Sequence, residues 1–187
     1  VCVSGSKRLK KWITDRNLQI NFCGKIILPQ KKTLDSQLDL LASRGEQNGA
    51  KTEFWQNSKL NEKFPLLNSI SGRALWSPNT AVVNPLEILN KLKDELISNG
   101  VNVLNNFQDY EIDINKKFLK RNENDQNKYK FKYLFNCAGI YASQIAKECS
   151  VSHQYSVIPF KGLYWKLEGI DLNSFNTNVY PVPDLNM

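Results

Sequence analysis

The chain has 187 residues, of which 41% are hydrophobic and 11% aromatic, and its formal net charge is +7. This composition is typical of a globular protein with one medium domain or parts of two, and it excludes a disordered chain. The basic residues are spread along the sequence without a recognised nucleic-acid-binding motif, so they favour a solvated surface and small anionic substrates over nucleic acid. No apolar run reaches the roughly 18 residues of a membrane span, and no signal peptide is visible. We therefore expect an intracellular protein without a transmembrane segment, either cytoplasmic or peripheral to a membrane.

The cysteine pattern argues against a metal site. The four cysteines form neither a CxxC pair nor a zinc-ligand spacing, and His153 is the only histidine. The chain opens on Val1 and closes on Met187, directly after a proline-rich segment. Neither end resembles a natural boundary, so we expect an internal piece of a longer protein.

The first part of the chain alternates helical and strand patterns. Helical spacing of apolar residues predicts a helix over 9–17, the apolar run 23–28 predicts a strand, and leucines spaced along 34–45 predict a second helix. Residues 51–77 show no clear pattern and receive no assignment.

The clearest helix follows Asn84, whose side chain can cap it, with Pro85 at the first helical position and Glu87 where a capping box places an acid. Four leucines on one face predict that this helix packs on a sheet. Gly100 can end it, and the alternating residues 101–104 predict a strand immediately afterwards.

A second strand-to-helix unit follows a polar segment. Residues 115–130 are rich in charge and asparagine, which predicts a hairpin tip or a surface insertion. Alternating aromatic residues over 129–135 predict a strand that leads into Asn136-Cys137-Ala138-Gly139, and a helix with its apolar face on 142–149 comes next. Small residues at such a corner let the backbone approach a ligand, and free amides at the start of the helix favour a phosphate or an electron-rich ring. A packed corner without a ligand explains these four residues equally well.

Several segments in order along the chain decide between these interpretations. They are CGKIIL (23–28), RGEQNGA (44–50), ALWSPNTAVVNP (74–85), FNCAGIYASQIAK (135–147), IPFKGLYWKL (158–167) and VYPVPD (179–184). Together they resemble the FAD-dependent oxidoreductases of the D-amino-acid oxidase superfamily, and within it the L-2-hydroxyglutarate dehydrogenase/oxidase family. The resemblance covers nearly the whole chain.

The resemblance implies a mixed α/β fold, in which part of an FAD-binding dinucleotide fold is interleaved with an antiparallel substrate-binding sheet. Residues 1–79 and 151–187 would belong to the substrate-binding sheet, and 80–150 to the FAD-binding part. We expect 23–28 and 157–167 to share a sheet. The sequence departs from the family in having no GxGxxG motif, so we expect this chain alone to bind FAD poorly.

The resemblance also assigns site residues. Gly139 would lie closest to FAD, with Cys137, Ala138 and Tyr141 beside it; the alternative for Gly139 is a structural turn residue. We interpret Cys137 as a small, buried and unreactive residue in close packing, in preference to a redox thiol.

On the substrate side, Lys161 stands where the family usually has arginine, and beside Gly162 it could hold a substrate carboxylate less tightly than a guanidinium would. Tyr164 and Tyr180 would offer phenol groups to the substrate. The alternatives are a surface lysine and two amphipathic aromatic residues on a sheet.

The implied reaction is oxidation of an L-2-hydroxy acid to the 2-oxo acid, by hydride transfer to flavin while a base removes the hydroxyl proton. The electron acceptor is not identifiable. We assign no catalytic residue, because His153 precedes the PFKG segment and is expected at the surface.

Two other functions stay open. A glycerol-3-phosphate dehydrogenase or an amino-acid oxidase of the same superfamily would share the Cys-Ala-Gly corner. A non-catalytic basic binding domain would explain the missing dinucleotide motif.

Overall fold

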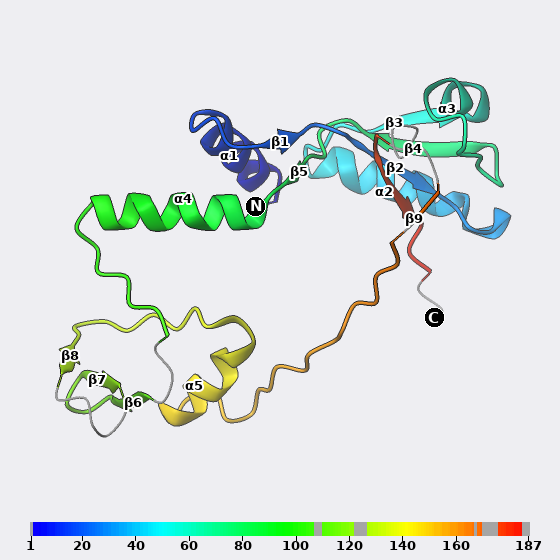
Figure 1. Ribbon diagram of the computed structural model, residues 1–187. Coiled ribbons are helices and arrows are strands. Elements are labelled where there is room, and N and C mark those ends of the chain that lie inside the picture. The colour runs from blue at the N-terminus through cyan, green and yellow to red at the C-terminus, as the bar shows by residue number, and fades with distance from the viewer. Residues whose placement is uncertain (1, 107–109, 122–126, 167, 170–175, 185–187) are drawn as a thin grey trace. The chain divides into compact units, whose positions relative to one another are not determined.

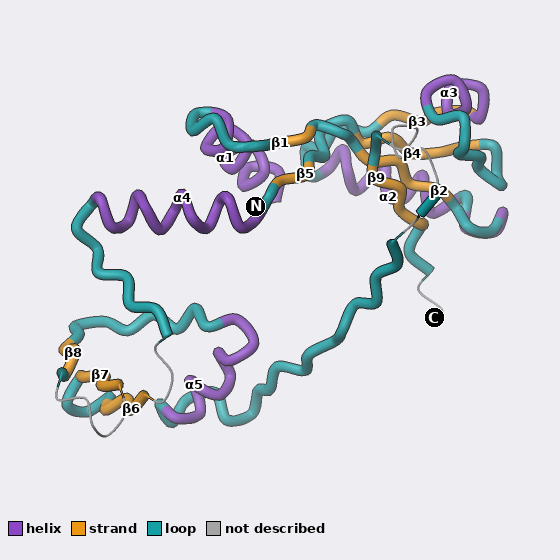
Figure 2. Tube along the Cα trace, in the orientation of Figure 1, coloured by secondary structure: helices purple, strands orange, loops and turns teal. Residues whose placement is uncertain are grey.

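The chain forms two compact units of mixed α/β structure (Figures 1 and 2). The computed structural model describes residues 2–106, 110–121, 127–166, 168–169 and 176–184. The first unit combines Val1–Asn99 with Leu167–Met187, and the second is Gly100–Lys166.

The first unit is built on a four-stranded sheet in the order β3-β4-β2-β9. Its strands are β2 (Lys25–Leu28), β3 (Glu53–Gln56), β4 (Arg73–Ser77) and β9 (Asn178–Pro181). β4 is antiparallel to both β2 and β3, whereas β9 runs parallel to β2. The expected pairing of the early and late segments is therefore found, but it uses 178–181. The expected strand over 157–167 was wrong, because residues 157–166 form no regular element.

Alternation along β4 gives each sheet face its own core. Ala74 points to the cluster that includes Ile26 and Trp55, while the next residue, Leu75, joins Leu38 and Val182. Side chains of a strand alternate between its two faces, so β4 contributes to both clusters. Helix α3 (Asn57–Lys63) supplies Leu60 to the first cluster, and α2 (Ser36–Gln47) supplies Leu38 to the second. α2 follows the short 3-10 turn η1 (Lys32–Leu34).

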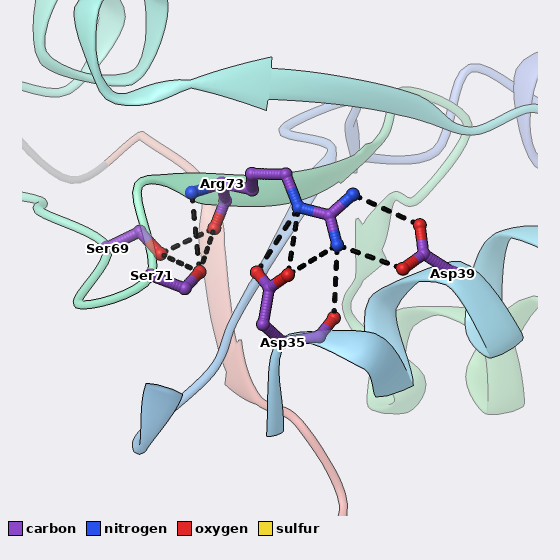
Figure 3. A network of polar contacts seen from close by, with 5 residues as sticks. All are labelled: Asp35, Asp39, Ser69, Ser71 and Arg73. Carbon is purple, nitrogen blue, oxygen red and sulfur yellow. Dashed lines mark hydrogen bonds and ion pairs between the residues drawn. The ribbon is translucent and has the colours of Figure 1, made fainter. Parts of the chain in front are cut away.

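Arg73 ties β4 to α2 through two carboxylates (Figure 3). Its Nε donates to Asp35 Oδ2 at 3.1 Å, and its Nη2 donates to Asp39 Oδ2 at 2.9 Å. The hydrogen bonds from Arg73 lower the pKa of both aspartates, and the aspartates raise the pKa of Arg73. Ser69 donates its hydroxyl to the Arg73 carbonyl oxygen, which anchors the preceding turn.

Helix α1 (Cys2–Thr14) and helix α4 (Pro85–Ser98) flank the two-stranded ladder of β1 (Ile20–Asn21) and β5 (Val82–Val83). The predicted cap of α4 is confirmed, since the Asn84 side chain accepts from the amides of Leu86 and Glu87. The Glu87 carboxylate, which a capping box would place against the Asn84 amide, accepts from the Gln19 backbone amide at 3.1 Å. Arg16 joins α1 to α4 through a two-pronged ion pair with Glu95.

The apolar face of α4 is not packed on a sheet within the described part of the chain. Four leucines on this face keep exposed fractions between 40% and 64%: Leu86, Leu89, Leu92 and Leu96. The prediction that they are buried against a sheet is therefore not met by this chain.

The second unit contains a three-stranded antiparallel sheet of β6 (Tyr110–Asp113), β7 (Phe118–Arg121) and β8 (Lys128–Lys130). The short 3-10 helix η2 (Gly139–Tyr141) and helix α5 (Ala142–Glu148) follow. The turn 114–117 overlaps the hairpin tip expected over 115–130, but the expectation of a loop was wrong for 118–121 and 128–130, which form β7 and β8. Two other expectations were wrong: 101–104 is not a strand, and the strand expected over 129–135 ends at Lys130.

Candidate functional site

The Cys-Ala-Gly corner is held in shape by the side chain of Asn136. Its Nδ2 donates to the Ala142 carbonyl oxygen at 2.8 Å, and its Oδ1 accepts from the Ala138 amide at 3.3 Å. The Tyr141 amide donates to the Ala138 carbonyl oxygen at 3.1 Å, which closes the turn. Asn136 thus bridges the two ends of the corner, although the sequence singled it out only as one of four small or polar residues.

Gly139 has the backbone conformation that only glycine adopts without cost. Its φ is +57°, in the left-handed region. A Cβ placed on Gly139 would meet no atom within 4 Å, so the space beside the backbone is open. An open, left-handed glycine at the start of a helical segment allows a ligand to approach the main chain closely.

A cavity of about 220 Å³ lies against this corner in the second unit. One wall comes from the sheet through Tyr110, Ile112 and Leu119, another from residues 134–138, and α5 adds Ile145. Of the predicted cofactor-binding residues, Cys137 and Ala138 line the cavity, whereas Gly139 and Tyr141 are not among its lining residues. Cys137 is exposed, so the expectation of a buried thiol was wrong. Tyr141 is 62% exposed.

Two ionisable groups near the cavity are held in their neutral forms. Burial raises the pKa of the Tyr110 phenol, and the negative charge of Glu148 raises it further. The same two causes raise the pKa of the Cys149 thiol. The sequence alone did not indicate Tyr110, because the segment before its strand has no clear periodicity.

The cavity is too small to hold a whole flavin dinucleotide. Pockets for drug-sized ligands typically occupy about 300–1,000 Å³, and this cavity is below that range. Its lining is mainly apolar, with the Tyr110 hydroxyl and the Asn136 amide as polar groups. These residues suit one edge of a bound ring system, and the remainder of the dinucleotide would need other residues.

Three of the predicted substrate-binding residues lie in an extended, exposed segment of the second unit. Lys161 and Gly162 are exposed, and Tyr164 is 94% exposed. The Tyr164 ring folds towards Gly162, where an added Cβ would meet the ring at 3.0 Å. This segment is therefore not a strand, and a substrate role for it stays a prediction.

Tyr180, the fourth predicted substrate residue, belongs to the first unit on β9. The Lys25 ammonium lies 5.4 Å from the centre of its ring, a cation–π contact. Asn178, two residues earlier, donates to the Cys23 sulfur at 3.2 Å and to the Gly24 carbonyl oxygen at 3.3 Å. The sharing of one sheet by the early and late segments was expected, but the pairing of 178–181 with 25–28 was not specified.

Comparisons with known proteins agree on one family. The whole chain, residues 1–187, matches the family described as DAO, FAD dependent oxidoreductase. It is 24% identical over 196 residues to a mitochondrial L-2-hydroxyglutarate dehydrogenase of Pongo abelii, covering 98% of this chain and 46% of that protein. It is 20% identical to the L-2-hydroxyglutarate dehydrogenase of Escherichia coli strain K12, covering 98% of this chain and 43% of that protein. The chain thus spans less than half the length of these relatives.

A solved structure supports the fold. The crystal structure of L-proline dehydrogenase from P. horikoshii superposes with a TM-score of 0.64 at 19% identity, covering 78% of this chain and 39% of that one. None of the described helices is long and apolar enough to cross a bilayer. The complete family match, together with this likeness in fold, shows that the chain belongs to the FAD-dependent oxidoreductase family.

Proposed function

We propose that this chain is part of an FAD-dependent dehydrogenase or oxidase that converts an L-2-hydroxy acid, L-2-hydroxyglutarate, to the 2-oxo acid. The observation that carries the proposal is the alignment of 98% of the chain with L-2-hydroxyglutarate dehydrogenases from both an animal and a bacterium. The animal relative is named as mitochondrial, so we propose the same location if the source is a eukaryote.

In this proposal the corner residues Cys137, Ala138, Gly139 and Tyr141 bind one part of FAD. The open backbone at Gly139 lets the ring approach, and the apolar cavity wall excludes water from it. When bound, the flavin supplies the acceptor for a hydride. The Tyr110 phenol adds no charge at the corner near neutral pH, and its raised pKa extends that neutral range upward.

Substrate recognition is assigned to a cation and two phenols. Lys161 would bind a substrate carboxylate by a charge-assisted hydrogen bond, and Tyr164 would donate its hydroxyl to the same molecule. Tyr180 on β9 is proposed to offer its phenol to a substrate, and the Lys25 ammonium lies over its ring. The base that removes the hydroxyl proton is not assigned to a residue of this chain.

The experiment is a substrate panel on a version extended at both ends to the length of the relatives and loaded with FAD. Reduction of a dye acceptor is followed with L-2-hydroxyglutarate, L-lactate, L-proline and glycerol 3-phosphate. We expect the highest catalytic efficiency with L-2-hydroxyglutarate. A preference for proline or glycerol 3-phosphate would place the protein elsewhere in the family, and flavin-free protein after loading would support a non-catalytic binding domain.

A further inference from the structure

A second cavity lies in the first unit and has a basic and aromatic lining. It measures about 460 Å³ and is bordered by one side of α1, by Phe22, by the turn 49–51 and by the loop 77–80. All of these residues belong to the same compact unit. The volume is within the roughly 300–1,000 Å³ range of pockets that hold small molecules.

The charge on this lining is of one sign. Lys7, Lys10 and Lys51 border the cavity, and none of the described residues that line it is acidic. The Lys10 ammonium donates to the Asn79 carbonyl oxygen, which fixes it at the rim. Lys51 is only loosely paired, because its ammonium lies 3.7 Å from a Glu53 carboxylate oxygen and its side chain is 66% exposed. Three ammonium groups around one hollow favour a ligand with more than one negative charge.

Phe22 gives the same cavity a flat apolar wall. Its side chain is 59% exposed, and the Lys10 ammonium lies 5.8 Å from the ring centre. Large exposed aromatic side chains that border a hollow commonly serve as stacking surfaces for a ligand ring. The lysines and this ring together define two separate requirements, a multiply charged anion and a planar apolar group.

We propose that this cavity binds small molecules in which an aromatic ring carries a phosphate group. The phosphate would lie among Lys7, Lys10 and Lys51, since lysine binds phosphate as a point charge, and the ring would stack on Phe22. The site lies in the other compact unit from the Cys-Ala-Gly corner, and its assignment does not depend on the proposed oxidation reaction.

The test is a titration of the purified protein with phenyl phosphate, followed by phosphorus and proton NMR. Inorganic phosphate and benzyl alcohol are titrated in parallel as the charged and apolar halves of the probe. We expect phenyl phosphate to bind more tightly than either half, and its affinity to fall with added salt because the ammonium groups are exposed.

Two cavity variants and one matched control separate this site from general charge attraction. Lys7→Gln is expected to weaken phenyl phosphate about tenfold, the size of one charge-assisted contact. Phe22→Leu should bring the affinity for phenyl phosphate close to that for inorganic phosphate. Lys93→Gln, which removes the same charge from the exposed surface of α4, should change nothing. Each variant is checked for native circular dichroism and melting temperature.

Three results would overturn the proposal. They are equal weakening by Lys7→Gln and Lys93→Gln, an unchanged affinity in Phe22→Leu, and phenyl phosphate binding no tighter than inorganic phosphate. The first would assign the attraction to net charge alone, and the other two would remove the ring from the recognition.

Discussion

Gly139→Ala, compared with a matched control, distinguishes a loss of fold stability from a loss of flavin affinity. Gly139 has φ +57° and nothing within 4 Å of an added Cβ, so alanine there meets no steric clash but adopts a left-handed conformation. That conformation costs roughly 1–2 kcal/mol for a residue with a Cβ. Gly100 has φ +81° and equally open surroundings, so Gly100→Ala is a matched control with about the same cost.

The two variants are compared in the extended version for melting temperature and for flavin affinity, measured by quenching of flavin fluorescence. Both should lose a similar amount of stability. Only Gly139→Ala should weaken flavin binding, by about tenfold or more, because a displacement that costs ~1.4 kcal/mol of binding free energy corresponds to a factor of ten. If both variants bind flavin as tightly as the parent protein, Gly139 is a turn residue and the cofactor assignment at this corner is wrong.

Three other changes test the remaining assignments. Lys161→Met should lower the catalytic efficiency on L-2-hydroxyglutarate about ten- to a hundredfold at full flavin content, whereas Lys161→Arg should keep it; unchanged kinetics in the Met variant would make this a surface lysine. Gly24→Ala should lower the melting temperature strongly, because φ is +66° and the new Cβ would overlap the Trp76 ring; an unchanged melting temperature would contradict the packing of β2 against β4. Arg73→Met should destabilise the first unit at neutral pH by ~1–2 kcal/mol, a value kept low because the guanidinium is 29% exposed. The pKa values of its two aspartate partners are lowered from 3.8, so the ion pairs stabilise the fold above that pH and the stabilisation is lost as the pH falls below it. The free energies of unfolding of parent and variant, measured by denaturant titration, should therefore converge in acid. A difference in unfolding free energy that stays constant with pH would refute the ion-pair assignment.

Local patterns predicted the elements whose signals lie within a few residues. The α4 helix was predicted from its cap and its leucine spacing, and the structure places its cap at Asn84 as expected. The helix after Gly139 was likewise predicted from apolar spacing and is present as α5. The backbone hydrogen bonds of both helices and the side-chain cap of α4 join residues that are close in sequence, so local patterns can predict them.

Local patterns do not predict which distant strands pair. β9 joins β2 across about 150 residues, in the register Lys25↔Asn178, and no local property of either segment specifies that partner. The aromatic alternation over 129–135 predicted too long a strand, because pairing with β7 ends at Lys130 and the following residues continue to the Cys-Ala-Gly corner without a partner strand. Alternation predicts which face of a sheet each side chain lies on, but the length of a strand depends on its pairing with the neighbouring strand.

In the candidate site, too, local patterns indicated some residues, whereas others depend on contacts that the sequence does not show. Cys137 and Ala138 were predicted from their small size at an expected strand-to-helix corner; both line a cavity, and their binding of FAD stays a prediction. Tyr110 and the bridging role of Asn136 depend on contacts between segments that are far apart or on side-chain geometry, which composition does not show. For the substrate residues the resemblance was the only guide, since Lys161 and Tyr164 lie on an exposed segment without regular structure.

The proposed activity is the oxidation of an L-2-hydroxy acid with bound FAD. Its most direct test is anaerobic mixing of the FAD-loaded, extended version with each enantiomer of 2-hydroxyglutarate, followed by the visible absorbance of the flavin. We predict rapid and complete loss of the oxidised flavin spectrum with the L enantiomer, a much slower change with the D enantiomer, and formation of one equivalent of 2-oxoglutarate. A flavin spectrum that stays oxidised with both enantiomers, in protein that carries full FAD, would contradict it.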